Sequence, residues 1–383
     1  MVTRVDVNPA MIKWAREEAG LTFEDLPASL KDAEKWENGE LKPTWADLRN
    51  LAKKYKRPSF FYLLSQPPKE EDDFIEFRSD DKIEEFSPNL RLEIRKAKFR
   101  RNAVIRINDT MGINHPNFSK FVSNNKNPIE LARYIRDILN VSFKTQQKWI
   151  FNDNGNRNPS HNSFLNHWKE VCADLGILVF ETEKVSEDEI SGCSLYFDNY
   201  PIILLNGKNS YNRRIFTLMH ELGHLIQGKS AICDVNKHNE KEVFCNKVAA
   251  EVLVPQDTFE EVILFTKKGD PKLGSLSNIY GVSKQTIVYR LNSLGYINEV
   301  LRNELISDIE EKNQRDKEKK ILHNKKGSPK ISTFIRKKKY DGIPYVKLVL
   351  NAYENEIITA PQATRYLEMP LDKFEIVDKE IWG

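Results

Sequence analysis

The chain has 383 residues, a formal net charge of +3 and 40% hydrophobic residues, which suggests two or three domains with packed cores. The near-neutral charge gives no overall sign of nucleic-acid binding. We find no apolar run of about 20 residues and no apolar N-terminal stretch, so neither a transmembrane segment nor a signal peptide is expected. Four widely spaced cysteines without a CxxC pair argue against a disulfide framework and against a cysteine-based zinc ribbon. We therefore expect a soluble, cytoplasmic protein without a membrane partner.

Residues 1–68 are predicted to form a small helical domain. Asn8 and Pro9 begin a first helix, Gly20 ends it, and Thr22 is placed to cap a second. Several short helices, with the sequence WENG before a turn, resemble the helix-turn-helix domain of lambda-repressor type. A plain helical bundle for protein contact is the alternative, because acidic side chains weaken binding to phosphates. The charged residues of the candidate recognition helix are Asp32, Glu34 and Glu37 against Lys31 and Lys35.

Residues 69–160 read as a linker arm followed by a helical region. The stretch 67–81 is polar and begins with prolines, which indicates a linker or an extended arm. Helices are predicted over 87–107 and 128–149, and a loop over 152–162. The first of these helices is basic, and we interpret its cations as a solvated face, with nucleic-acid contact as the alternative. These cations are Arg91, Arg95, Lys96, Lys98, Arg100, Arg101 and Arg106.

The hydrophobic pattern changes within residues 161–300. An amphipathic helix is expected over 164–176, followed by strands at 177–181, 191–197 and 200–206. The last two strands are joined by a short polar turn, which is typical of an antiparallel hairpin. The fold class is therefore α+β, with a small antiparallel sheet.

A second helix-turn-helix-like unit is predicted over residues 274–295. Gly281 lies in its turn, and Ser283 can cap its second helix. Since that helix carries only Lys284 and Arg290 as cations, a helical subdomain packed on the core is favoured slightly over DNA contact.

The C-terminal part divides into a charged segment and a small domain. Residues 301–330 are dense in charge and are expected to form a linker or a solvated helix. Residues 331–383 are expected to form a small C-terminal domain. Thr359 and Gln362 have capping-box spacing at the start of one of its helices.

The most informative segment is RRIFTLMHELGHLIQG, residues 213–228. His220 and His224 are four positions apart, so on a helix both imidazoles face the same way and can bind one zinc ion. Glu221 is one residue on, where its carboxylate can contact the attacking water as a general base instead of binding the metal. The alternative is a histidine pair on the surface beside an incidental glutamate.

Catalytic zinc needs a third protein ligand, and the next predicted helix supplies candidates. Glu242 leads its largely apolar face, and Asn246, one turn later, can hydrogen-bond a ligating imidazole. Glu251 faces elsewhere by helical phase, and Glu240 is too near the loop. Rival ligands are His238, Cys233 and Cys245, although Cys245 can equally be a small core residue.

These motifs resemble the ImmA/IrrE metallopeptidases of bacteria and their mobile elements. The segments that carry the resemblance are ISGCSLYFDNYPIILLNGKNSYNRRIFTLMHELGH and EKEVFCNKVAAEVLVP. In that family a second helix begins with a glutamate that is the third zinc ligand, ahead of a motif like N-x-x-A-A-x-x-L-x-P. The positions that match are Glu242, Asn246, Ala249, Ala250, Leu253 and Pro255. The N-terminal segment WENGELKPTWADLRNLAKKYKRPSFFYLLSQPP is similar to the longer members, which carry a repressor-like (XRE-type) domain. The segments GVSKQTIVYRLNSLG and YVKLVLNAYENEIITAPQATRYL are also similar to parts of those members.

The resemblance implies a zincin-like core of gluzincin type and a Zn²⁺ cofactor. It also implies cytoplasmic cleavage of a transcriptional regulator, which derepresses a neighbouring operon or mobile element. The expected partner is then a repressor or a toxin-linked regulator encoded nearby. Two other classes remain open: an antitoxin-like or DNA-binding regulator whose metal site is structural or idle, and a metal sensor without proteolysis.

Zinc peptidases of this type commonly hold the substrate along an edge strand of the sheet. We predict that residues 202–205 form this edge and add an extended peptide by main-chain hydrogen bonds. The residues of this substrate edge strand are Ile202, Ile203, Leu204 and Leu205.

Overall fold

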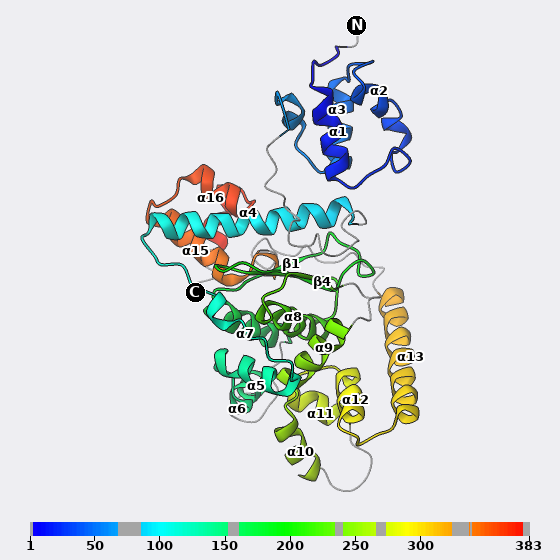
Figure 1. The fold of residues 1–383 in the computed structure, drawn as a ribbon, viewed down its shortest axis with the longest axis vertical. Helices are drawn as coiled ribbons and strands as arrows, with labels where there is room; N and C mark the ends of the chain where they lie inside the picture. Colours follow the sequence, from blue (N-terminus) through cyan, green and yellow to red (C-terminus); the bar gives the residue numbers. More distant parts are fainter. Residues whose placement is uncertain are drawn as a thin grey trace. The chain divides into compact units, whose positions relative to one another are not determined.

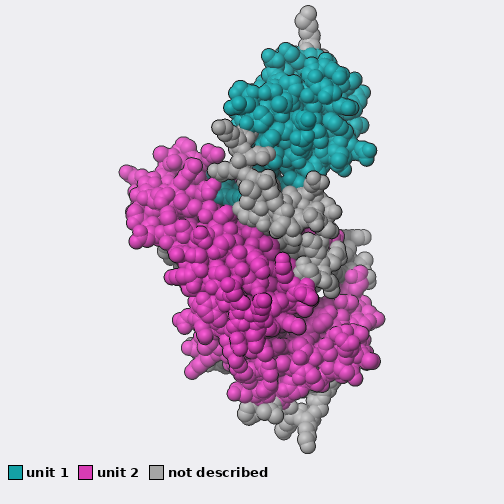
Figure 2. Space-filling view, viewed as in Figure 1, with its two compact units in different colours: residues 1–99 teal, residues 100–383 magenta. Residues whose placement is uncertain are grey.

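The structure is a computed structural model, and it describes residues 3–67, 86–151, 161–233, 240–265, 273–323, 337 and 339–377. The chain divides into two compact units, residues 1–99 and 100–383 (Figure 2). Two predicted segments fall largely outside the described residues, the linker arm at 67–81 and the loop at 152–162. The end of the charged segment 301–330 and the start of the C-terminal domain 331–383 also lie outside them.

The first unit is helical, as predicted. Its elements are α1 (Pro9–Glu18), η1 (Ala28–Leu30), α2 (Ala33–Glu37), α3 (Trp45–Tyr55) and η2 (Ser59–Leu63). Asn8 caps α1 by accepting a hydrogen bond from Ala10 N at 3.0 Å, and Thr44 and Asp47 form a capping box at α3. The core of this unit is made by buried side chains that include Met11, Ile12, Trp36, Leu48 and Tyr55.

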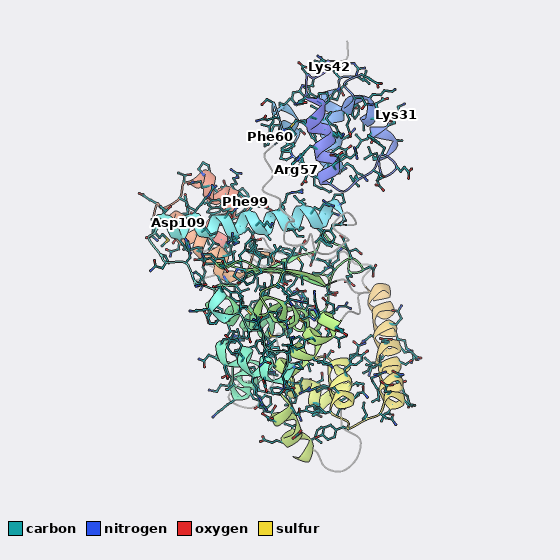
Figure 3. The ribbon with its side chains drawn as sticks, in the orientation of Figure 1. Lys31, Lys42, Arg57, Phe60, Phe99 and Asp109 are labelled. Atoms are coloured by element: carbon teal, nitrogen blue, oxygen red, sulfur yellow. The ribbon has the colours of Figure 1, made fainter. Side chains whose placement is uncertain are left out.

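The candidate recognition helix is short, and part of its charge is paired within the unit. Thr22 contacts Asp25 at 2.8 Å, but the chain after it forms a turn and the 3₁₀ helix η1, so the α-helix expected there is absent. Glu37 is bound by Arg16 through two hydrogen bonds of 2.8 and 2.9 Å. Lys31, Lys42 and Arg57 lie at separate places on this unit (Figure 3), and Arg57 forms an ion pair with Glu18 at 3.6 Å.

Helix α4 (Pro88–Thr110) is basic, as predicted, but the interpretation of its cations as a solvated face is wrong for two of them. Arg91 and Arg100 are each only 5% exposed. Arg91 donates to Glu18 O at 3.1 Å, and Arg100 forms an ion pair with Asp341 at 2.8 Å. These two guanidinium groups bind partners inside the protein, because a buried cation must be paired. They are therefore not available to contact a nucleic acid.

The second unit contains a four-stranded sheet with the order β1-β3-β2-β4. The strands are β1 (Leu178–Thr182), β2 (Gly192–Leu195), β3 (Ile202–Asn206) and β4 (Ala231–Cys233). β2 and β3 form the antiparallel pair that was predicted, but β1 is parallel to β3, so the sheet is mixed and not antiparallel throughout. The chain leaves β1, forms β2 two places away in the sheet, and returns as β3 between these two strands.

The prediction of a substrate edge strand at Ile202, Ile203, Leu204 and Leu205 is therefore wrong. β3 pairs with β1 on one side and with β2 on the other, and all of its residues are buried. The continuous apolar run of β3 shows that it is covered on both faces, which reflects the helices that pack on the sheet and does not distinguish an edge strand from a central one. The outer strands of the described sheet are β1 and β4.

Helices cover both faces of this sheet (Figure 1). On one face lie α7 (His161–Asp174), α8 (Tyr211–Ile226) and α9 (Glu240–Leu253). On the other face, Phe180 of β1 contacts Tyr345 of α15 (Ile343–Glu354), with 5.8 Å between ring centroids. The C-terminal α16 (Ala360–Tyr366) begins with the predicted capping box, followed by η6 (Leu371–Lys373).

The remaining helices extend the core beneath α8 and α9. They are α5 (Pro128–Ile138), α6 (Phe143–Ile150), α10 (Gln256–Phe265), α11 (Leu273–Tyr280) and α12 (Lys284–Ser293), with the short η5 (Ser119–Phe121). The unit α11–α12 contributes Tyr280, Ile287 and Leu291 to the same core as the sheet, in agreement with a packed helical subdomain. The charged segment continues as the helix α13 (Glu299–His323). No helix in the described parts of the chain has the length and low charge needed to cross a bilayer.

Candidate metal centre

The helix α8 carries the histidine pair and is buried along most of its length. Ser210 caps its start by accepting from Arg213 N at 3.3 Å, and Gly228 follows its end with a positive φ of 69°. His220 is 5% exposed and His224 is 3% exposed. A polar pair at this depth requires partners, because burial of polar groups without them is costly.

The partner is Glu242, in the first turn of α9. Its Oε2 lies 3.0 Å from Nε2 of His220, and its Oε1 lies 3.3 Å from Nε2 of His224. The two Nε2 atoms are 3.1 Å apart. One donor atom from each of the three residues lies within 4.8 Å of the others, so the predicted ligands His220, His224 and Glu242 converge.

Asn246 lies where the sequence predicted, one turn after Glu242. Its Oδ1 is 2.9 Å from Nδ1 of His220. An amide oxygen only accepts hydrogen bonds, so this contact places an imidazole proton on Nδ1. Nε2, which faces Glu242 and His224, is then the nitrogen that can bind a cation or carry a second proton. The site therefore presents Lewis bases to a common point.

Converging bases need a cation or protons between them. Burial lowers the pKa of His220, but the hydrogen bond to Glu242 and the nearby Glu221 carboxylate outweigh it and raise that pKa. Burial likewise raises the pKa of Glu242, but the two imidazoles outweigh it and hold that pKa far below its ordinary range. A bound divalent cation satisfies the same groups, and two imidazoles with one carboxylate form a donor set that zinc accepts.

Glu221 is fully buried and faces strand β2. Its Oε1 would be 3.3 Å from a Cβ added at Gly192, and Cγ2 of Thr217 would be only 2.6 Å away. Only glycine permits this approach of α8 to the strand. Sequence reasoning missed Gly192, although an isolated glycine inside a predicted strand is a signal for close backbone approach.

The rival ligands have other surroundings or lie outside the description. Cys245 is buried, with its Sγ 3.5 Å from a Cβ built at Gly223, and burial raises the pKa of its thiol. It is a small core residue at the crossing of α8 and α9. Glu251 faces away from the site, as predicted, and pairs with Arg290. His238 and the side chain of Cys233 are outside the described residues.

Comparison with known families agrees with this geometry. Residues 172–292 match the family described as Peptidase_M78, IrrE N-terminal-like domain. The match begins in α7 and ends in α12, so it includes the whole sheet, both histidines and Glu242. The match supports the resemblance to the ImmA/IrrE family over this part of the chain. No curated protein and no solved structure matches the chain.

Proposed function

We propose that residues 172–292 form a zinc-dependent endopeptidase domain with a zincin-like core. The observation that carries this proposal is the convergence of His220, His224 and Glu242 from two helices inside the matched region. These three side chains would hold the ion. When bound, zinc supplies a Lewis acid that makes water acidic near neutral pH.

Two residues of the chain carry out proton transfer and orientation of the ligands. Glu221 accepts a proton from the attacking water and delivers it to the leaving amine, because a carboxylate that does not bind the metal is free to change protonation state. Asn246 cannot titrate, so it holds the His220 ring in the orientation that binding requires. Burial of Glu221 excludes bulk water from the proton it carries.

The proposed substrate class rests on the resemblance to the ImmA/IrrE metallopeptidases and not on the geometry of the site. We propose a cytoplasmic endopeptidase of limited specificity that cleaves a transcriptional regulator encoded beside it. For unit 1 we propose recognition of that protein partner, because the candidate recognition helix carries Asp32 and the exposed Glu34, and acidic side chains weaken binding to phosphates. DNA binding by the same unit is the competing outcome.

The test is cleavage of the regulators encoded by the neighbouring genes, followed by intact-mass spectrometry. The parent chain with zinc should cut one of them at a defined bond. Glu221→Gln keeps the shape and the zinc ligands but loses the base, so cleavage should slow by at least about a hundredfold. Equal cleavage by this variant would remove Glu221 from the mechanism and favour a contaminating protease or a different base.

A further inference from the structure

The C-terminal end of α9 is held by side chains from three other helices. The last carbonyls of a helix lack partners within it and are usually capped by water or by a glycine turn. Here they accept hydrogen bonds from side chains instead. The pairs are Arg136 Nη1 to Val252 O at 2.6 Å, Gln146 Nε2 to Leu253 O at 3.0 Å and Arg290 Nε to Val254 O at 3.0 Å.

We call the three hydrogen bonds from Arg136, Gln146 and Arg290 the α9 clamp. A buried ion pair reinforces this clamp. Arg290 of α12 also binds the carboxylate of Glu251, and the two residues are 6% and 4% exposed. The other oxygen of Glu251 accepts from Gln256 N at 2.9 Å. The planar guanidinium of Arg290 therefore makes two contacts, one with the Glu251 carboxylate and one with the backbone carbonyl of Val254. Two contacts from one planar group fix both the distance and the orientation of α12 relative to the end of α9.

The clamp connects α9 to the α11–α12 unit at two points. Besides Arg290 from α12, the buried Gln146 donates to Leu253 O and to Tyr280 O, the end of α11, both at 3.0 Å. The α11–α12 unit thus contacts the backbone of the helix whose first turn carries Glu242. Neither Gln146 nor Arg290 belongs to the metal-ligand group.

A rigid helix transmits this constraint to the metal site. Glu242 lies about two and a half turns before Glu251 on α9. Metal–ligand distances hold within about 0.2 Å, so a rotation of the helix by a few degrees would displace a carboxylate from its bonding position. At the crossing with α8, the directed contacts of α9 are those of Glu242 and Asn246 with the histidines, and these belong to the site itself. The hydrogen bonds at the C-terminal end of α9 therefore fix the rotation of the helix independently of the metal site.

We infer that Arg290 is a positioning residue for the metal site, and that the α11–α12 unit acts through it to hold Glu242 in register with His220 and His224. This inference rests on the proposed zinc site. It assigns the helix-turn-helix-like unit a role in setting metal affinity, in place of DNA contact.

The test compares zinc affinity among folded variants, measured by competition with a chromogenic chelator. Glu251→Gln with Arg290→Met removes the ion pair without leaving a buried charge. Arg290→Lys is the milder change, since it keeps a cation for Glu251 but loses the fork that also reaches Val254 O. The matched control is Arg133→Met with Asp257→Asn, because that pair lies in the same unit but is exposed, with its closest atoms 3.1 Å apart.

The double variant should bind zinc about tenfold more weakly or worse, Arg290→Lys should fall between it and the parent, and the control should match the parent. Thermal unfolding of the metal-free proteins separates this effect from lost stability, because a merely structural role lowers the melting temperature without changing the affinity of the folded protein. A zinc affinity equal to that of the parent in Arg290→Lys, or in a folded double variant, would overturn this inference but leave the proposed function standing. If the double variant does not fold, Arg290→Lys decides. Absence of zinc binding in the parent would overturn both this inference and the proposed function.

Discussion

Nδ1 of His220 on α8 lies 2.9 Å from Oδ1 of Asn246 on α9. This contact joins the two helices that supply the metal ligands, and it determines which nitrogen of the ring faces the site. A ring that could flip or exchange tautomers would present a protonated nitrogen to the metal for part of the time. Asn246 therefore acts on binding although it has no place in the ligand group.

Asn246→Leu should weaken zinc binding by about ten- to a hundredfold, because the ring loses the acceptor that orients it. Asn246→Asp keeps an acceptor and should remain close to the parent. Chelator competition measures both affinities. The neighbouring exposed Lys247 gives the control, Lys247→Ala, which should bind zinc as the parent does. Parent-like affinity in Asn246→Leu would contradict the orienting role.

Gly192→Ala should destabilise the protein by about 1–3 kcal/mol, because the new methyl group meets Thr217 Cγ2 at 2.6 Å and Leu204 O at 3.1 Å. Adding Thr217→Ser removes the first clash and should restore part of the stability. It should not restore cleavage, since the methyl group still presses on Glu221 Oε1 at 3.3 Å. Urea unfolding and the cleavage assay report the two effects separately.

The control for this prediction is Gly274→Ala in α11, where the nearest atom to the added Cβ is 3.9 Å away. It should leave stability unchanged or raise it slightly, as alanine does in helices. If Gly192→Ala behaves like this control, α8 does not depend on a close approach to β2.

Glu181→Gln should cost about 3 kcal/mol or more, because Glu181 neutralises two buried cations. Lys169 Nζ lies 2.5 Å from its carboxylate, Arg214 binds the other oxygen, and none of the three is more than 6% exposed. Loss of one partner leaves uncompensated buried charge. Glu183→Gln is the matched control, since that side chain is 41% exposed and its pair with Lys339 should contribute less than about 1 kcal/mol. Equal urea midpoints for the two variants would contradict this assignment.

Cys172 and Cys193 should resist alkylation in the native protein at pH 8. Burial raises the pKa of Cys172 to about 12 and that of Cys193 well above its usual range. The fraction of Cys172 present as the reactive thiolate at pH 8 is then on the order of one in ten thousand. This fraction becomes appreciable only as the pH approaches the pKa. Peptide mapping after iodoacetamide treatment, with and without denaturant, measures this. Rapid native labelling of either residue would show that it is accessible.

Local signals in the sequence predicted much of the site. The spacing of His220 and His224 and the phase of Glu242 and Asn246 follow from the helical repeat alone, and the structure brings all four together. The capping box of Thr359 and Gln362 is equally local, and it forms as predicted. These features depend on residues within one or two turns of each other or on two adjacent helices.

Long-range pairing explains what the sequence did not predict. The parallel alignment of β1 with β3 depends on where the chain returns after β2, and no residue of β3 encodes that choice locally. The buried positions of Arg91 and Arg100 depend on acceptors at Glu18 and Asp341, far away in the sequence. A cation count cannot distinguish such residues from a solvated basic face.

The central claim is that His220, His224 and Glu242 hold one zinc ion, and native mass spectrometry after reconstitution with zinc tests it most directly. The parent and Glu221→Gln should each carry about one zinc per chain, as expected for a three-ligand site. His220→Ala should carry none, and Glu242→Ala should lose most of its zinc under the same conditions. Zinc-free parent protein, or full occupancy in His220→Ala, would contradict the account.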